Sequence, residues 1–264
     1  MSDIRLICLD FDGTIMSYDG GQEFFHPLAV DMLNRLPQLG IAWCTNSGRE
    51  QQNQLKILET SRARGLCHMP SALLCSESLI FPRRDGRYES CENWNRQAID
   101  DLKTFHGVLQ HILHPFMAGW MSRYEAMVYA GDTYTTLCVP DVDNRSELLF
   151  QEMIVAIRPV PRAMVTRNGG WLSFLPEHLG KGNVLRAYLK MTGVGMGQAL
   201  AIGDHFNDLS MLDGRVTRNV GCPASAVPDV VQSVRVAQGH VASVGGPEGT
   251  IEVVEYFLAR KPDA

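Results

Sequence analysis

The sequence predicts an α/β protein, a doubly wound parallel sheet of the Rossmann type with a smaller α+β domain inserted into it. Apolar, strand-like runs alternate with helix-like stretches in the first and last thirds of the chain. The middle third interrupts this alternation. Two of the apolar runs end in carboxylates, near residues 10 and 204, at the strand ends where open α/β sheets bind their ligands.

The first third predicts a βαβ unit. Residues 6–9 are an apolar run, and apolar residues then recur at helical spacing over 28–36. A Pro/Gly break precedes the next apolar run, residues 41–44. Strands that alternate with helices in this way favour a parallel sheet covered on both faces.

The middle of the chain predicts a different architecture. Residues 98–112 form a long amphipathic stripe, 126–139 are typical of a strand or hairpin, and 164–174 predict two strands around an Asn-Gly-Gly turn. Helix and strand signals alternate again over 184–189, 199–202 and 216–220. We therefore expect a core domain of residues 1–81 and 176–264, and an inserted α+β cap domain of residues 82–175 that sets substrate specificity.

Composition restricts the partners. The 264 residues carry a net charge of −5 and contain no Lys/Arg-rich run, which argues against nucleic acid or an anionic membrane. No apolar segment approaches the roughly 20 residues needed to span a bilayer. The seven cysteines include no C-x-x-C pair, as expected of reduced thiols. We expect a cytoplasmic protein with a small-molecule partner, either a monomer or a small homo-oligomer.

The segment Asp10-Phe11-Asp12-Gly13-Thr14 follows the first apolar run. In a strand, residues i and i+2 project to the same side, so Asp10 and Asp12 can flank one small volume. Two unit charges about 4 Å apart repel by roughly 4 kcal/mol at an effective dielectric near 20. A divalent cation is the natural compensation, and an ordinary Asp-x-Asp-Gly turn at the surface is the alternative.

Three further segments carry candidate ligands. Thr45, Asn46 and Ser47 follow a strand and precede a helix, where hydroxyls and N–H groups either bind phosphate or cap the helix. Lys181 opens another helix, where a cation is unfavourable unless an anion is shared; a solvated surface lysine is the alternative. Asp204 and Asp208, with Asn207, follow a second apolar strand.

In this order, the four segments resemble the motifs of the haloacid dehalogenase superfamily of phosphohydrolases. The core is further similar to the Cof-like sugar-phosphatase branch, which carries its cap between the second and third motifs. The similar stretches are Ser47-Gly48-Arg49, Leu179-Gly180-Lys181-Gly182, Gly203-Asp204-His205-Phe206-Asn207-Asp208 and Asn219-Val220-Gly221-Cys222-Pro223.

The resemblance implies a role for each residue. Asp10 would be the nucleophile and Asp12 the general acid and base. Mg2+ would be held by Asp10, the Asp12 main-chain carbonyl and Asp204, with Asp208 orienting the metal shell and Lys181. Lys181, Asn46 and a hydroxyl would bind phosphate, and Asn207 would touch phosphate or a metal-bound water. Alignment on Gly48-Arg49 favours Ser47 as that hydroxyl, whereas the Thr-Asn-Ser run favours Thr45, which is slightly preferred.

The expected activity is Mg2+-dependent hydrolysis of a small phosphorylated metabolite, with a sugar phosphate as the leading substrate class. Two alternatives stay open: a phosphomutase of the same superfamily, and a catalytically inactive metabolite-binding regulatory module. The helical histidines of the insert, His106, His111 and His114, are expected to face solvent rather than to bind zinc.

Overall fold

The computed structural model describes residues 3–140 and 142–260, which divide into two compact units. One unit contains residues 1–91 and 181–264, and the other contains residues 92–180. The expected insert of residues 82–175 starts earlier, inside a strand that pairs with the core sheet. No helix in the described part of the chain has the length and apolar character needed to cross a membrane.

The first unit is built on an eight-stranded sheet in the order β14-β13-β12-β1-β4-β5-β6-β7. Neighbouring strands from β14 to β5 are parallel, whereas β6 and β7 are joined antiparallel at one edge. The strands span β1 (Leu6–Leu9), β4 (Ala42–Asn46), β5 (Ala72–Cys75), β6 (Leu79–Arg84), β7 (Arg87–Tyr88), β12 (Ala199–Ile202), β13 (Asn219–Cys222) and β14 (His240–Val241).

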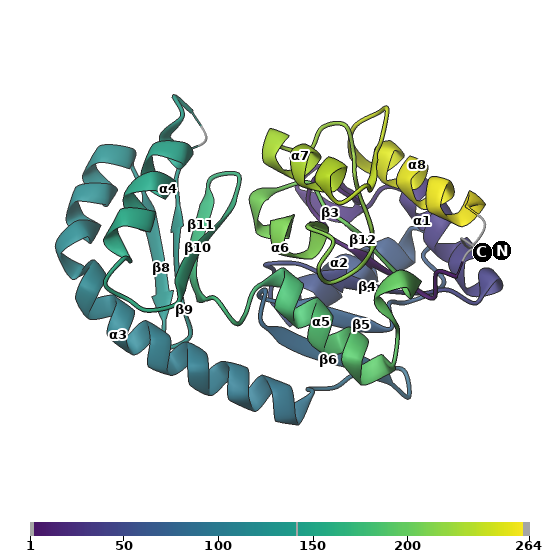
Figure 1. Cartoon of the computed structure of the whole chain (residues 1–264), viewed down its shortest axis with the longest axis horizontal. Coiled ribbons are helices and arrows are strands. Elements are labelled where there is room, and N and C mark those ends of the chain that lie inside the picture. The colour runs from purple at the N-terminus through teal and green to yellow at the C-terminus, as the bar shows by residue number, and fades with distance from the viewer. Residues whose placement is uncertain (1–2, 141, 261–264) are drawn as a thin grey trace. The chain divides into compact units, whose positions relative to one another are not determined.

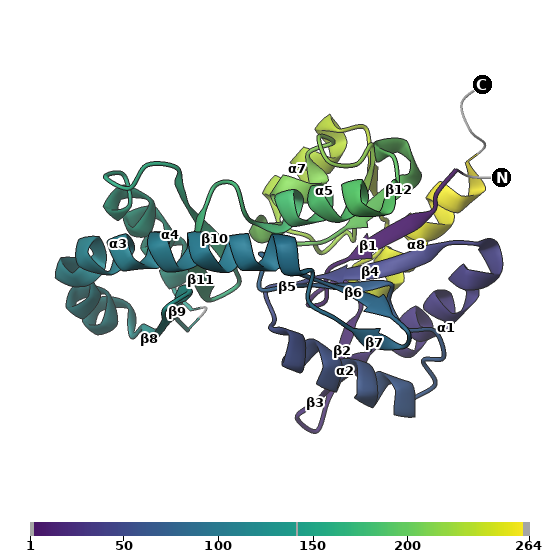
Figure 2. The ribbon, with the colours of Figure 1, turned by 90° about the horizontal axis from the view of Figure 1, so that it is seen from below.

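Helices cover both faces of this sheet, as the predicted fold class requires (Figure 2). One face packs against α1 (Pro27–Arg35), α2 (Gln51–Ala63) and α8 (Gly246–Ala259). The other face contacts α5 (Lys181–Thr192), α6 (Leu209–Leu212) and α7 (Pro228–Val236). Short 3₁₀ turns, η1 (Leu36–Leu39), η2 (Met196–Gln198) and η3 (Phe206–Asp208), join these elements.

The central strand β1 is buried along its whole length and lies between β4 and β12. The chain leaves β1 toward β4 and β5 on one side, and later returns through β12 and β13 on the other. The strand order therefore reverses at β1. In doubly wound sheets a reversal of this kind leaves a crevice at the carboxyl ends of the strands, where ligands bind.

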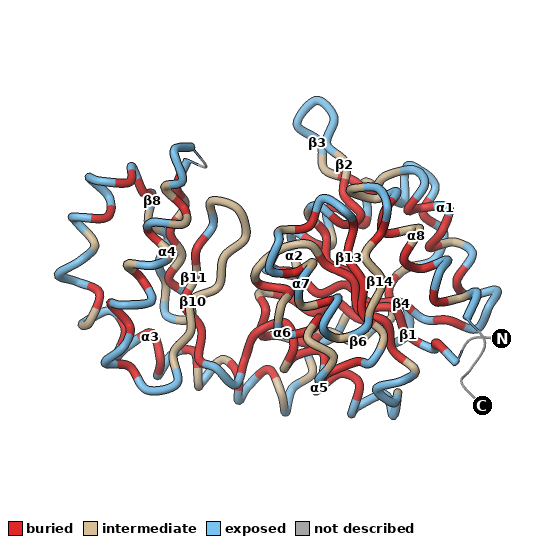
Figure 3. The backbone as a smooth tube through the Cα atoms, turned by 45° about the horizontal axis from the view of Figure 1, so that its top comes forward, coloured by how far each residue is buried: buried red, intermediate tan, exposed pale blue. Residues whose placement is uncertain are grey.

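A small hairpin, β2 (Met16–Asp19) with β3 (Gln22–Phe25), directly follows β1. Its Gly20-Gly21 tip has positive φ at both residues and is exposed to solvent (Figure 3). At its base, Phe25 makes an edge-to-face contact with Phe11, with ring centroids 5.2 Å apart. The aromatic contact anchors the hairpin beside the end of β1.

The second unit is an α+β domain, as predicted, with two helices packed on one face of a four-stranded antiparallel sheet (Figure 1). The sheet has the order β10-β11-β9-β8. Its elements are α3 (Glu92–Tyr124), β8 (Met127–Gly131), β9 (Tyr134–Cys138), α4 (Arg145–Ala156), β10 (Ala163–Asn168) and β11 (Trp171–Pro176).

Two local expectations are wrong. His106 does not face solvent: its side chain is fully buried under the sheet, and Nδ1 lies 3.2 Å from Thr135 Oγ1. The strand expected over 216–220 starts only at Asn219, because the hydroxyl of Thr217 donates to the carbonyl oxygens of Ala199 and Asn219 and shapes a turn there.

Candidate active site

Asp10 stands at the carboxyl end of β1, where the backbone turns sharply. The N–H groups of residues 14, 15 and 16 all point to the carbonyl oxygen of Phe11, at 3.0–3.2 Å. Gly13 has φ +72°, and a Cβ atom there would lie 2.0 Å from Asp204 Oδ2. Glycine is therefore required both by the turn and by the close approach of the turn to Asp204.

The structure brings together three of the predicted carboxylates with the predicted lysine. Asp10, Asp204 and Asp208 each offer an oxygen within 4.8 Å of the others. Lys181, fully buried at the start of α5, donates from Nζ to Asp10 Oδ1 at 2.6 Å and to Asp208 Oδ1 at 2.7 Å. The alternative of a solvated surface lysine is thus excluded.

Asp208 fixes the loop that carries Asp204. Its Oδ2 accepts hydrogen bonds from the backbone N–H groups of Asp204 and His205, each at 3.0 Å. A single carboxylate therefore orients the lysine with one oxygen and the β12–η3 loop with the other. Charge-assisted bonds of this kind are among the strongest in proteins.

Negative charge exceeds positive charge in this cluster. Burial raises the pKa of Asp10 well above its usual value, and Asp208 adds to the rise while Lys181 opposes it. Burial and Asp208 likewise raise the pKa of Asp204 to about 7. Burial alone would lower the pKa of Lys181, but Asp10, Asp208 and Glu77 raise it instead. Lys181 remains an ammonium group, and an additional cation would relieve the remaining carboxylate repulsion.

The donor set fits a hard divalent cation. Asp10 Oδ2 and Asp204 Oδ1 are buried and have no hydrogen-bond partner within residues 3–140 and 142–260. Carboxylate oxygens left bare in this way are costly unless something positive binds them. Mg2+ prefers oxygen ligands, so the cluster of Asp10, Asp204 and Asp208 fits the metal expected from the sequence.

The carboxylate of Asp12 lies outside the acidic cluster, in a bonding pattern of its own. Arg49 donates to both of its oxygens, from Nε at 3.0 Å and from Nη2 at 2.8 Å, and the hydroxyl of Tyr18 donates to Oδ1. Arg49 also reaches Glu23, with bonds of 2.8 and 2.9 Å. Burial alone would raise the pKa of Asp12, but the bonds and charge of Arg49 lower it below its usual value.

The hydroxyls of the second segment differ in their surroundings. Thr45 is fully buried and donates to Gln54 Oε1 at 2.6 Å, so its hydroxyl proton is already engaged inside the fold. The hydroxyl oxygen of Ser47 accepts the Arg49 N–H at 3.2 Å, which leaves its proton available. Asn46 Nδ2 donates to the carbonyl oxygen of Lys181 at 3.0 Å. This geometry favours Ser47 over Thr45 as the phosphate-binding hydroxyl.

Asn207 is 5% exposed, and its Nδ2 donates to Glu77 Oε1 at 2.9 Å. Sequence reasoning did not single out Glu77, nor the hairpin residues Tyr18 and Glu23, because an acidic or aromatic residue in a loop is no signal by itself. The two-glycine tip could have predicted the hairpin, and register would then have placed Tyr18 opposite Glu23.

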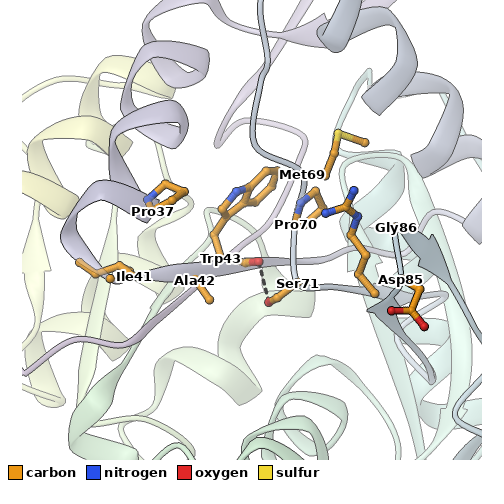
Figure 4. Close-up of a pocket in the computed structure, with 11 residues that line it drawn as sticks. Pro37, Ile41, Ala42, Trp43, Met69, Pro70, Ser71, Asp85 and Gly86 are labelled. Atoms are coloured by element: carbon orange, nitrogen blue, oxygen red, sulfur yellow. Dashed lines mark hydrogen bonds between the residues drawn. The ribbon is translucent and has the colours of Figure 1, made fainter.

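A surface hollow of about 440 Å³ lies at the other end of β4 (Figure 4). It is lined mainly by apolar residues around Ala42 and Trp43, with Arg83 and Asp85 at the β6–β7 turn. None of the predicted site residues lines it. The hollow therefore has no part in the chemistry argued from the strand ends.

Known proteins share both sequence and fold with the chain. The family model of haloacid dehalogenase-like hydrolases matches residues 125–216, a segment that contains Lys181, Asp204 and Asp208. A comparison with curated protein sequences gives no significant match.

Solved structures match almost the whole chain. The sucrose-phosphatase from Synechocystis sp. PCC6803, solved with sucrose and phosphate, superimposes with a TM-score of 0.70 at 17% identity, over 97% of this chain and 98% of that one. A HAD/COF-like hydrolase from Plasmodium vivax gives 0.71 at 13%, over 97% and 96%. A sugar phosphatase of HAD subclass IIB gives 0.62 at 13%, over 96% and 98%.

At such low identities, these structures show that the fold is shared and nothing more. The match in sequence comes from the family model and covers residues 125–216. That match ends shortly after Asp208, and folding brings Asp10 of β1 into contact with the matched lysine. The chain thus matches the model of haloacid dehalogenase-like hydrolases over residues 125–216, and it shares the fold of the solved structures over nearly its whole length.

Proposed function

We propose that the chain is a Mg2+-dependent phosphatase of the Cof-like type that hydrolyses a small phosphorylated metabolite through an aspartyl-phosphate on Asp10. The observation that carries the proposal is the buried Lys181 ammonium group, which joins Asp10 to Asp208 beside two carboxylate oxygens that lack partners. A structural ion pair would have no need of the third carboxylate, Asp204.

In the first step, a carboxylate oxygen of Asp10 attacks phosphorus, and the bond from phosphorus to the leaving oxygen breaks. Asp12 gives a proton to that oxygen, so the leaving group departs as an alcohol. Lys181 balances charge on the phosphoryl oxygens, and Ser47 with Asn46 orients them. Thr45 takes no part, because its hydroxyl bonds Gln54.

In the second step, water attacks phosphorus and the bond to Asp10 breaks, which releases phosphate. Asp12, which the first step leaves as a carboxylate that Arg49 stabilises, accepts a proton from that water and is protonated again for the next turnover. Asp10, Asp204 and the main-chain carbonyl of Asp12 would hold Mg2+, with Asp208 in support. When bound, the metal supplies positive charge that lowers the repulsion between the nucleophile and the phosphate.

A sugar phosphate is the substrate class we propose, supported by the sucrose-phosphatase and the subclass IIB sugar phosphatase that share the fold. We assign substrate selection to the unit of residues 92–180. A cytoplasmic location is supported by seven free cysteines, two of which, Cys8 and Cys44, lie opposite each other on β1 and β4. We propose a monomer or a small homo-oligomer.

The test is Mg2+-dependent phosphate release across phosphorylated sugars, phosphoglycerates, nucleotides and cofactors. We expect strong turnover of one sugar phosphate and none without Mg2+. Activity that appears only when a bisphosphorylated sugar is added would identify a phosphomutase instead. No turnover from folded protein that binds Mg2+ would leave a metabolite-binding module as the better description.

A further inference from the structure

Glu77 is a buried acidic residue beside the site that the proposed mechanism does not use. It follows β5 and is 7% exposed. Both Ser76 and Glu77 have left-handed backbone conformations, with φ of 52° and 54°. Such conformations are unfavourable for residues other than glycine, so two in succession persist only where the surroundings impose them.

The backbone of residues 47–49, which follows β4, holds this strained loop. The N–H of Glu77 donates to the carbonyl oxygen of Ser47 at 3.3 Å, and the N–H of Ser76 donates to that of Arg49 at 3.1 Å. A Cβ atom on Gly48 would lie 3.4 Å from Glu77 Oε1. The strain therefore places a carboxylate against the loop that the mechanism assigns to phosphate binding.

The contact with Glu77 engages the nitrogen of the Asn207 side-chain amide and leaves the amide oxygen without a partner in the described residues. An ionised carboxylate can only accept, so the atom of Asn207 that lies 2.9 Å from Oε1 is the amide nitrogen. Asn207 Oδ1 is buried and has no hydrogen-bond partner within the described ranges. The buried atom of Asn207 that lacks a partner is therefore an acceptor, while the amide nitrogen keeps a second N–H besides the one that Glu77 accepts.

An acceptor suits the metal and not the phosphate. Phosphate oxygens need donors, whereas waters that hydrate a metal ion donate hydrogen bonds. We infer that Glu77 is a positioning residue that fixes the amide of Asn207, so that Oδ1, which cannot donate to a phosphate oxygen, orients the hydration shell of Mg2+. The inference rests on the proposed function. Of the two contacts that the resemblance implies for Asn207, phosphate and a metal-bound water, it selects the second.

Two substitutions separate the hydrogen bond from the charge. Glu77→Gln removes the charge but keeps an oxygen that can accept from Asn207. Glu77→Gly removes both and places glycine where φ is positive, so the fold should be retained with an unchanged or higher melting temperature. Glu59→Gln, on the exposed face of α2, is the matched control for loss of one negative charge.

The measurement is calorimetric titration of the full chain with Mg2+. Because partners of metal ligands typically contribute about 10–100-fold in affinity, we expect Glu77→Gly to raise the Kd at least about tenfold. Glu77→Gln and Glu59→Gln should stay within about threefold of the original chain, since both leave the hydrogen bond in place. Equal losses in Glu77→Gln and Glu77→Gly would mean that charge alone matters, and would overturn the inference.

Asn207→Ala tests the connection between the two residues. It should weaken Mg2+ binding as Glu77→Gly does, and adding Glu77→Gly to it should cause no further loss. With Mg2+ saturating, inhibition by inorganic phosphate should be unchanged in Asn207→Ala. Weaker phosphate inhibition with normal Mg2+ binding would restore Asn207 as a phosphate ligand and refute the inference.

The same titrations separate this inference from the proposed function. If the original chain neither binds Mg2+ nor releases phosphate, the proposed function itself fails. If it does both and Glu77→Gly binds Mg2+ equally well, only the role of Glu77 is wrong.

Discussion

At the scale of single residues, Asp10 carries both the proposed chemistry and an unfavourable charge. It is 1% exposed, and burial raises its pKa, with a further rise from Asp208 and an opposing effect of Lys181. Ionisation of the nucleophile is thus less favourable in the metal-free protein than it is for an aspartate in water. A group selected for reactivity is commonly kept at such a cost to stability.

Asp10→Asn should therefore abolish turnover without loss of the fold. The amide cannot act as the nucleophile, and it removes one charge from a cluster of three carboxylates. We expect no phosphate release above background and, without metal, a melting temperature equal to or above that of the original chain. Comparable turnover in Asp10→Asn would disprove the nucleophile assignment, and a large drop in melting temperature would disprove the charge argument.

It was easier to predict from the sequence which charged residues lie close together than to predict the role of each one. Asp10, Asp204 and Asp208 follow buried strands, and parallel strands deliver their carboxyl ends to one edge, so their meeting was foreseeable. Thr45 and Ser47 were not separable, because the choice depends on Gln54, a residue of the following helix. Glu77 could not be found, since its role depends on backbone angles and on one contact with Asn207.

At the scale of elements, the β2–β3 hairpin and the loop after β4 meet at Asp12. The hairpin supplies Tyr18 and Glu23, which face each other across its strands, and the loop supplies Arg49. Asp12 is bonded directly by Tyr18 and Arg49, whereas Glu23 acts through Arg49. The hairpin is therefore expected to orient the acid–base group.

Tyr18→Phe tests this element. Loss of the hydroxyl frees one side of Asp12, and since general acid–base catalysis contributes about 10²–10⁴-fold, partial misorientation should lower kcat by about tenfold. KM should change little, because neither Tyr18 nor Asp12 binds the phosphate in the proposed mechanism. Steady-state kinetics on the best substrate measures both constants.

Two further substitutions in the hairpin serve as comparisons for Tyr18→Phe. Glu23→Gln should lower kcat less than Tyr18→Phe, because it acts on Asp12 only through Arg49. Asp19→Asn, at the exposed end of the same hairpin, should match the original chain. A change in KM alone for Tyr18→Phe would indicate that the hairpin binds substrate and does not orient Asp12.

Element boundaries were harder to predict than element types. The amphipathic stripe over 98–112 predicted a helix, but α3 extends from Glu92 to Tyr124 and contains Pro115. Buried residues of α3 continue beyond the stripe, to Leu113, Trp120 and Tyr124. The expected insert of residues 82–175 included the end of β6 and all of β7, which the structure joins antiparallel to the edge of the core sheet.

At the scale of the whole molecule, metal binding and folding are linked through the unit of residues 1–91 and 181–264. Asp10 lies before the inserted unit and Lys181, Asp204 and Asp208 after it, so the site exists only when both segments are folded together. A ligand that binds the native state alone stabilises it by about 2.7 kcal/mol at a hundred times its Kd. Mg2+ should therefore raise the melting temperature of this unit.

The size of that rise should depend on pH. Asp204 has a pKa of about 7 in the folded, metal-free protein, above the value of about 3.9 expected for an unfolded chain. Between these values the folded state binds more protons than the unfolded state. The stability contributed by this group is thus present below pH 4 and is lost as pH rises through 7.

Mg2+ replaces the proton that Asp204 would otherwise hold, so its binding strengthens over the same range. We expect the melting temperature without metal to fall from pH 5 to pH 8, and the rise caused by saturating Mg2+ to be larger at pH 8 than at pH 5. Thermal unfolding with and without Mg2+ at both values measures the difference. Asp204→Asn should reduce the fall in melting temperature without metal, and the raised pKa of Asp10 should account for the remainder. An equal rise at the two pH values would mean that Asp204 is already ionised at pH 5, and that the metal replaces no proton there.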